Sequence, residues 1–275
     1  MSSAREKTPV VFIVSISSDI GTQLALHYLE KGATVCGTYR TKCPPALTGK
    51  SGVRTIQCDI AQPNCTEEIA TFFSGSGLRW DIFISCVGQL APVGLFFETA
   101  FETWSESVNT NSMAQLRALH AAYPFRHDGQ ICHTVFFAGG GTNNPFHAYS
   151  AYCLGKIALI KMCELLDDEA PDLNAFIVGT GWVRTKIHEQ TLAAGARAGG
   201  NHAATAAFLD DPTKTSTRFE EIAAMIDWGV AQGRAVAGGR NFSVVHDNWR
   251  NGGTQLASAL RADLHKFKLR RHGNS

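Results

Sequence analysis

The sequence predicts a single α/β domain built on a doubly wound parallel sheet. The chain has 275 residues, of which 44% are apolar, and this is enough for one large hydrophobic core. Short apolar runs rich in β-branched and aromatic residues alternate along it with longer segments that have the helical period. Strands separated by helices require right-handed crossovers, which leave helices on both faces of a parallel sheet.

The alternation of strands and helices continues almost to the end of the chain. We expect strands at residues 9–16, 34–39, 53–57, 81–86, 130–137, 173–178 and 241–245. We expect helices at residues 21–31, 66–73, 102–123, 149–169 and 217–229. No internal repeat and no linker rich in Pro or Ser divides the sequence, so we expect one domain over residues 1–275.

Residues 186–217 are the least regular part of the sequence. They contain Ala-Gly-Ala-Arg-Ala-Gly-Gly and Asp-Asp-Pro, and they lie between a strand end and a later helix. Doubly wound folds place a cover over the ligand at this point. The position favours a substrate lid, and a merely flexible loop is the alternative.

Charge and composition exclude several classes of protein. The 25 basic residues against 24 acidic residues give a net charge of +1, so we expect no nucleic-acid partner. The longest uncharged stretches are too short or too broken for a membrane span of about 20 residues, and the apolar run near the N-terminus reads as a strand and not as a secretory signal. The 8 cysteines show no CxxC pair and no zinc-finger spacing. We therefore expect no metal site, no membrane partner and a cytoplasmic location.

The turn after the first strand is the first candidate ligand site. In a doubly wound sheet this turn offers free N–H groups and the positive end of a helix to a pyrophosphate. Only Gly21 remains of the three glycines expected there, and Ser15 and Asp19 take the other two positions. The candidate cofactor-binding residues of the turn are Ser15, Ser17, Ser18, Ile20 and Gly21. An ordinary N-cap by Ser17, Ser18 or Asp19 explains the turn equally well, and the charge of Asp19 opposes a bound phosphate unless its side chain is turned away.

The end of the second strand indicates which dinucleotide binds. Where an acidic residue would accept hydrogen bonds from a ribose 2′-hydroxyl, the chain has Tyr39, followed by Arg40 and Lys42. A guanidinium offers forked, charge-assisted donors to phosphate oxygens. The sequence therefore predicts NADP as the cofactor. Arg40 as a solvated charge at a strand end is the alternative.

Tyr152 and Lys156 lie at the beginning of the predicted helix of residues 149–169. Side chains four residues apart lie on one face of a helix and within reach of each other. A phenol is a poor acid at neutral pH, but a neighbouring ammonium stabilises the phenolate and lowers the phenol pKa. Tyr152 is therefore a candidate proton donor or acceptor.

These residues stand in an order that resembles the short-chain dehydrogenase/reductase family, from Val10 to about Trp249. The segments that carry the resemblance are Ser17-Ser18-Asp19-Ile20-Gly21, Arg40, Cys58-Asp59-Ile60, Ser85-Cys86-Val87-Gly88, Val108-Asn109, Tyr152 with Lys156, and Thr180-Gly181-Trp182-Val183-Arg184-Thr185. The resemblance implies a Rossmann-like fold and hydride transfer between a nicotinamide and a carbonyl or alcohol carbon. Tyr152 would exchange the proton on the substrate oxygen.

The resemblance also implies roles for further residues. Lys156 would hold the nicotinamide ribose, and Asn109 would support a water near this lysine, with a satisfied core amide as the alternative for Asn109. Asp59 would accept from the adenine amino group and Ile60 would lie against the adenine ring, although Asp59 also reads as the start of a turn. The remaining cofactor-binding residues that it implies are Val87, Val183 and Thr185.

The largest departure from the family lies ahead of Tyr152. The family keeps a serine there that hydrogen-bonds the substrate oxygen, and this position falls on Gly139. Loss of one donor to a developing oxyanion costs on the order of 3 kcal/mol unless another group replaces it. The polar residues that follow are Thr142, Asn143, Asn144 and His147. Of these we expect Thr142 to replace the serine, and the N–H groups of the Gly-Gly-Gly run are a further alternative.

The sequence thus predicts an NADP-dependent oxidoreductase that acts on a ketone, aldehyde or secondary alcohol, such as a biosynthetic intermediate. The expected catalytic residues are Tyr152, Lys156, Asn109 and Thr142. Two alternatives stay open: a dehydrogenase-fold protein that binds nucleotide or assembles with partners without hydride transfer, and an isomerase or dehydratase. Family members commonly assemble through two long helices, here residues 102–123 and 149–169, so we expect a homodimer or homotetramer unless these apolar faces are internal core.

Overall fold

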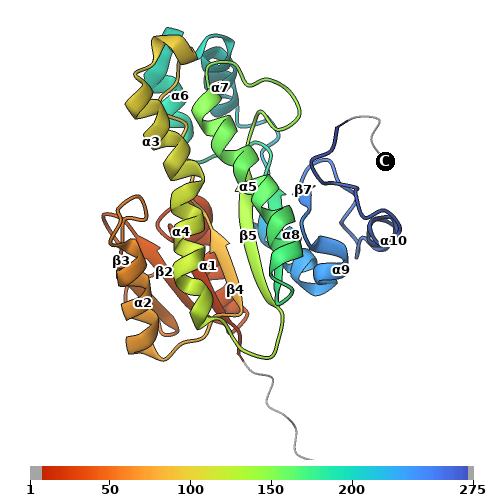
Figure 1. Cartoon of the computed structure of the whole chain (residues 1–275). Coiled ribbons are helices and arrows are strands. Elements are labelled where there is room, and N and C mark those ends of the chain that lie inside the picture. Colours follow the sequence, from red (N-terminus) through yellow and green to blue (C-terminus); the bar gives the residue numbers. More distant parts are fainter. Residues whose placement is uncertain (1–7, 272–275) are drawn as a thin grey trace, which may run out of the picture.

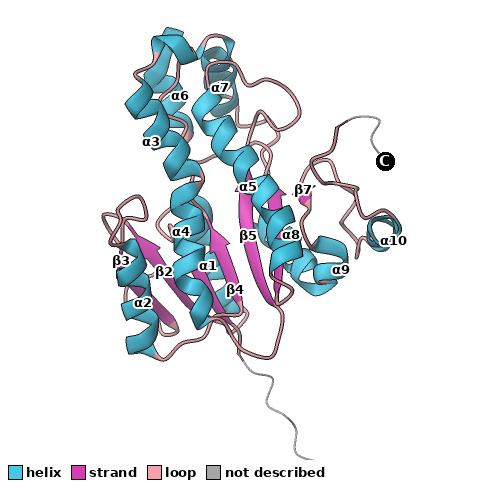
Figure 2. Ribbon diagram, in the orientation of Figure 1, coloured by secondary structure: helices cyan, strands magenta, loops and turns pink. Residues whose placement is uncertain are grey.

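A seven-stranded parallel sheet forms the centre of the molecule, in a computed structural model that describes residues 8–271. Its strand order is β3-β2-β1-β4-β5-β6-β7, and every neighbouring pair is parallel. The strands are β1 (Val10–Val14), β2 (Thr34–Tyr39), β3 (Val53–Gln57), β4 (Ile82–Ser85), β5 (Cys132–Ala138), β6 (Leu173–Gly179) and β7 (Asn241–Ser243). Helices cover both faces of this sheet (Figure 2), so the predicted doubly wound α/β fold is confirmed.

The strand order reverses beside β1. All residues of β1 are buried, as expected of a central strand that pairs with β2 on one side and β4 on the other. In such a sheet a ligand crevice opens at the carboxyl ends of the strands where the order reverses. The turn after β1 and the residues after β4 therefore lie at one edge of the same crevice.

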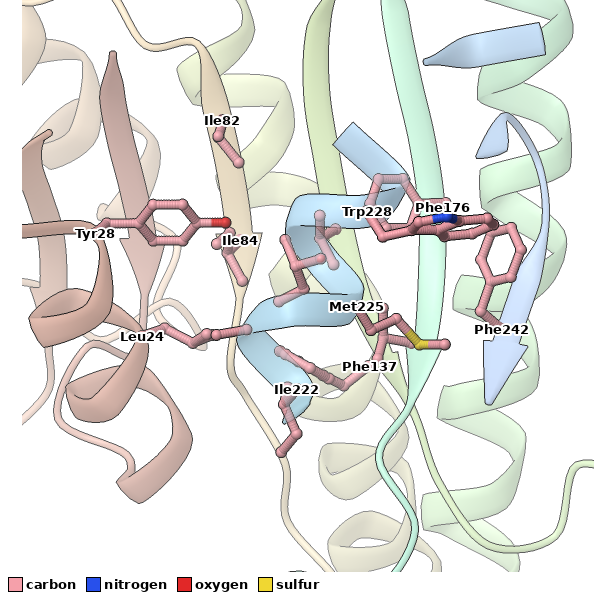
Figure 3. Close-up of a cluster of buried hydrophobic side chains, with 14 of the residues drawn as sticks. Leu24, Tyr28, Ile82, Ile84, Phe137, Phe176, Ile222, Met225, Trp228 and Phe242 are labelled. Atoms are coloured by element: carbon pink, nitrogen blue, oxygen red, sulfur yellow. The ribbon is translucent and has the colours of Figure 1, made fainter. Parts of the chain in front are cut away.

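Helices pack on the two faces of the sheet through separate hydrophobic clusters. The main helices are α1 (Asp19–Glu30), α2 (Cys65–Ser76), α4 (Met113–Ala122), α5 (Ser150–Glu169) and α8 (Phe219–Gln232). Figure 3 shows Leu24 of α1 and Ile222 of α8 in one of these clusters. Ile13 belongs to that cluster, and its neighbour Phe12 belongs to the cluster under α2, α4 and α5. This division follows from the strand, because successive side chains point to opposite faces. No helix within residues 8–271 is long and apolar enough to cross a membrane.

The predicted helix of residues 102–123 is interrupted near its middle. It consists of α3 (Phe101–Asn111) and α4, which are separated by Ser112 with φ −138° and ψ −78°. The Ser112 N–H donates to Asn109 O at 3.3 Å, so the regular helical bonding stops there. Apolar residues continue at helical spacing across the break, and the pattern alone therefore predicted one helix.

Residues 186–217 are more regular than the sequence indicated. They contain α6 (His188–Ala194) and α7 (Gly200–Asp210), which contact each other and are seen at the top of Figure 1. Gly195 and Gly199 have φ 56° and 53° and separate these helical elements, so the glycine-rich sequence marks helix ends and not a long loop. A lid function for this helical segment stays a prediction.

The C-terminal residues cover the outer edge of the sheet. β7 is the last strand, and the Asn241 N–H donates to Phe267 O at 2.9 Å. Edge strands with unpaired backbone groups are templates for aggregation, and this contact reduces that exposure. The segment around Phe267 is held in turn by helices α9 (Arg234–Ala237) and α10 (Thr254–Ala262) through Arg240, which donates to Val236 O and Leu260 O.

Candidate active site

One cavity of about 1240 Å³ gathers nearly all the residues that the sequence singled out. It runs along the carboxyl ends of the strands, where doubly wound sheets bind their ligands. The predicted residues that line it are Ser15, Ser17, Ser18, Ile20, Arg40, Asp59, Ile60, Val87, Thr142, Tyr152, Lys156, Val183 and Thr185. Gly21 and Asn109 are outside this lining. The structure therefore brings the candidate residues together, and their roles stay predictions.

The first turn keeps the backbone of a glycine-rich turn although two glycines are replaced. Ser15 has φ 60°, a value that favours glycine, and its N–H donates to Thr38 Oγ1 at 3.1 Å. Ser18 caps α1, because its Oγ accepts the Gly21 N–H at 3.0 Å. A Cβ on Gly21 would lie 2.5 Å from Ser15 O. Gly21 therefore permits the close backbone approach within the turn, while Ser15, Ser17 and Ser18 line the cavity.

Asp19 does not cap the helix in this turn. Its Oδ2 accepts the backbone N–H of Lys186 at 2.7 Å, from the segment that follows β6. The ammonium of Lys186 donates to Ser17 O at 3.1 Å and lies 3.8 Å from Asp19 Oδ1. The negative charge of Asp19 is thus partly balanced by a residue that is distant in sequence.

The predicted contacts to the adenosine part of the cofactor lie after β2 and β3. Arg40 and Lys42 are exposed and line the cavity beyond β2. Asp59 begins a turn, since its Oδ1 accepts the Ala61 N–H at 3.1 Å, while the neighbouring Ile60 is buried. The turn geometry that the sequence left open for Asp59 is therefore present, and Asp59 still lines the cavity.

Tyr152 and Lys156 are buried on the first turns of α5, with 8% and 3% of their surfaces exposed. Lys156 Nζ donates to Val87 O at 2.8 Å and lies 5.8 Å from the centroid of the Tyr152 ring. Burial lowers the pKa of Lys156 to about 8. Burial, and the nearby Cys153 thiol, raise the pKa of Tyr152 well above its usual value.

The expected effect of Lys156 on the Tyr152 pKa is therefore wrong for this state of the protein. The sequence predicted that the ammonium lowers this pKa, but the ammonium bonds to Val87 O and the phenol is desolvated. Desolvation penalises the phenolate more than a cation at this distance stabilises it.

The hydroxyl of Tyr152 occupies the place of the missing serine side chain. A Cβ at position 139 would overlap Tyr152 Oη and its ring, which only glycine permits. Thr142 Oγ1 lines the cavity and donates to Gly139 O at 3.0 Å, and its replacement of the serine stays a prediction.

The buried amide of the catalytic region is Asn111 and not Asn109. Asn109 is half-buried and lies outside the cavity lining, whereas Asn111 is fully buried at the end of α3. Asn111 Nδ2 donates to Gln89 O at 2.8 Å, and its Oδ1 accepts the Gln89 N–H at 3.0 Å. A Cβ on Gly155 would lie 2.5 Å from Asn111 Cβ, so α3 contacts α5 one residue before Lys156. The spacing of Ser107, Asn111 and Gln115 on one buried helical face was the sequence signal for this residue.

Sequence reasoning also missed a residue that joins α6 to the loop after β4. Gln190 Oε1 accepts the N–H groups of Leu90 and Ala91 at 2.8 and 2.9 Å. Gln190, Leu90 and Ala91 line the same cavity as Tyr152. A glutamine in a helix has no local sequence signal for a contact 100 residues away.

The matching family model decides the family. The model described as short chain dehydrogenase matches residues 9–194, which is most of the chain. The chain belongs to the short-chain dehydrogenase family. The resemblance drawn from the motifs is thereby confirmed.

Solved structures of short-chain dehydrogenases share this fold at low sequence identity. An aldohexose dehydrogenase from Thermoplasma acidophilum is 17% identical, with a TM-score of 0.70 over 86% of this chain and 92% of that chain. A short-chain dehydrogenase/reductase from Saccharomyces cerevisiae is 18% identical, with a TM-score of 0.73 over 86% and 96%. A short chain dehydrogenase from Shigella flexneri 2a, complexed with NADP, is 20% identical, with a TM-score of 0.70 over 86% and 96%. No curated protein sequence matches the chain.

Proposed function

We propose that the chain is an NADP-dependent oxidoreductase that acts on a ketone, an aldehyde or the corresponding secondary alcohol. One observation carries this proposal: a single cavity joins the first turn and Arg40 at one end to Tyr152 and Lys156 at the other. An extended dinucleotide requires both ends. When bound, the nicotinamide supplies or accepts the hydride.

The residues of the cavity fit a dinucleotide. The left-handed backbone of Ser15 and the close approach at Gly21 shape the turn that a pyrophosphate needs, and Ser18 leaves the end of α1 facing the cavity. Arg40 would bind the 2′-phosphate, and Asp59 with Ile60 would hold the adenine. Val87, Val183 and Thr185 line the same cavity as Tyr152 and would hold the nicotinamide.

Tyr152 would move the proton at the substrate oxygen through its Oη. Its raised pKa makes the phenol a weak acid until Lys156 Nζ leaves Val87 O for the ribose hydroxyls and approaches the ring. Asn111 would act as a positioning residue, because it fixes the approach of α3 to α5 beside Lys156. The substrate oxygen would have Tyr152 as its main hydrogen-bond donor, since position 139 carries no side chain.

A protein that binds NADP without hydride transfer is the second candidate. Two contacts favour this candidate. The Tyr152 hydroxyl lies in the place of the family serine, and the Thr142 hydroxyl donates to Gly139 O. Calorimetric titration with NADPH, followed by a screen of ketones and aldehydes, separates the two. Turnover supports the oxidoreductase, binding without turnover supports the second candidate, and the absence of binding overturns both.

Replacing Arg40 with alanine is expected to weaken NADPH binding at least about 30-fold, because charge-assisted hydrogen bonds to the 2′-phosphate are lost. NADH lacks this phosphate, so its dissociation constant should change less than about threefold. Calorimetry on both cofactors measures the two effects. Arg54→Ala is the matched control, since Arg54 is an exposed arginine of the next strand that bonds to Ser76 O and lies outside the cavity. Equal losses for NADPH and NADH in Arg40→Ala would assign Arg40 another role.

We further propose that the chain assembles as a homodimer or homotetramer through the outer faces of α4 and α5. Met113, Leu154 and Leu165 on these helices are 49%, 49% and 42% exposed. Large apolar side chains that are exposed on helices favour a protein contact over solvent. Sedimentation velocity should give a mass at least twice that of the chain, and a species of monomer mass would contradict the assembly.

A further inference from the structure

Within the described residues 8–271, Lys186 is the one residue after β6 whose backbone and side chain both form hydrogen bonds with the first turn. Its N–H donates to Asp19 Oδ2 at 2.7 Å, and its ammonium donates to Ser17 O at 3.1 Å. The Lys186 and Asp19 side chains are 60% and 34% exposed, and both line the cavity. The pair therefore joins the two walls of the crevice without being buried in either.

The negative charge of Asp19 would oppose the binding of a pyrophosphate, and the Lys186 ammonium lies close enough to offset that charge. Asp19 is the first residue of α1, and a dinucleotide pyrophosphate would approach this end of the helix. A carboxylate there repels the phosphates, whereas a glycine would not. The Lys186 ammonium lies against this turn, where its charge opposes that of Asp19.

The ammonium of Lys186 is held weakly enough to move from Ser17 O to a bound phosphate. Its one short contact is a neutral backbone carbonyl, Ser17 O, and its distance to Asp19 Oδ1 is 3.8 Å, beyond hydrogen-bonding range. A doubly charged pyrophosphate attracts an ammonium more strongly than a neutral carbonyl does. The backbone bond to Asp19 holds the Lys186 main chain in place while the side chain moves.

We propose that Lys186 is a pyrophosphate-binding residue that compensates for Asp19 in the first turn. Before binding, the lysine side chain lies on Ser17 O, and in the complex its ammonium bonds to the phosphates. This inference rests on the proposed function, because it takes a nicotinamide dinucleotide as the ligand. It separates two cations of the cavity by their targets: Lys186 for the pyrophosphate that NADPH and NADH share, and Arg40 for the 2′-phosphate.

The test is the binding of three probes to Lys186→Met, which removes the ammonium and keeps the Lys186 N–H. The dissociation constants of NADPH and NADH should both rise about tenfold, because each carries the pyrophosphate. The affinity for adenosine 2′-monophosphate, which lacks a pyrophosphate, should stay within about twofold. Calorimetry and cofactor fluorescence read these values without any turnover.

A matched control comes from a second Lys–Asp pair, which joins Lys31 at the C-cap of α1 to Asp227 of α8. Lys31 Nζ lies 2.8 Å from Asp227 Oδ2 with similar exposure, outside the cavity, so Lys31→Met should leave all three constants unchanged. Asp19→Asn should tighten both dinucleotides about threefold, and Asp19→Asn with Lys186→Met should return toward the wild-type values.

The outcomes separate this inference from the proposed function. If wild-type protein binds NADPH and Lys186→Met binds it equally well, the lysine only fastens α6 to the first turn and the inference is overturned alone. A loss limited to NADPH, or a loss shared by adenosine 2′-monophosphate, also overturns it. If wild-type protein binds neither dinucleotide, the proposed function fails first.

Discussion

Tyr152→Phe is expected to lower the turnover of a carbonyl substrate by at least about a thousandfold, while the dissociation constant of NADPH stays within about twofold. The variant removes the hydroxyl that would exchange the proton at the substrate oxygen. It keeps the ring, which is 8% exposed and packed over Gly139. Because Gly139 has no side-chain donor, little residual side-chain stabilisation of the oxyanion should remain. Steady-state kinetics and calorimetry measure the two quantities.

Tyr123→Phe is the matched control for this variant. The Tyr123 hydroxyl donates to Asp172 Oδ1 at 3.0 Å and lies outside the cavity, so its loss removes a phenol without touching the site. Turnover of this control should stay within about twofold of the wild type. Undiminished turnover in Tyr152→Phe would show that another group carries the proton, and loss of NADPH binding in it would show that the ring shapes the cofactor site.

Arg240→Met is expected to lower the free energy of unfolding by about 4 kcal/mol. Arg240 is 2% exposed, and its guanidinium donates to backbone carbonyls of Ala235, Val236, Leu260, Asp263 and Lys266. Methionine fills much of the volume but leaves these buried acceptors without donors, which is the costly outcome. Equilibrium urea unfolding, followed by circular dichroism, measures the change.

Arg79→Met tests whether this loss comes from burial and not from the removal of any arginine. Arg79 is exposed and donates to Pro124 O at 2.7 Å, so its replacement should cost less than about 1 kcal/mol. Arg240→Met should also expose the edge of β7, because Arg240 holds the residues that cover it. A loss below about 1 kcal/mol in Arg240→Met would mean that water satisfies these carbonyls at low cost.

Elements with a strong local pattern were predicted well from the sequence. The bounds expected for β2 and β3, residues 34–39 and 53–57, are those of the structure. Elements that depend on a distant contact were predicted less well. The break at Ser112 lies where the side chain of Asn111 bonds to Gln89, and no local pattern reports that contact.

In the candidate site too, residues within a local motif were predicted from the sequence, whereas contacts between distant segments were not. The first turn, Arg40, Tyr152 and Lys156 were found from the sequence because each lies within a few residues of its motif partners, and the parallel sheet brings strand ends together at one edge. The structure differs from the expected direction of the Tyr152 pKa, and it places Asn111 at the buried contact with Gln89 and Thr142 Oγ1 on Gly139 O. The catalytic roles expected for Asn109 and Thr142 stay predictions.

The sequence by itself determined the family, the doubly wound sheet and the residues that gather in one cavity, since these follow from local periodicity and motif spacing. Only the tertiary structure decided which groups are bonded within that cavity. Lys156 bonds to Val87 O, 69 residues away, and Lys186 bonds to Asp19 across 167 residues. The physical reason is that burial and hydrogen bonds set the charge and the pKa of each group, and the partners come from segments that only the folded chain brings together.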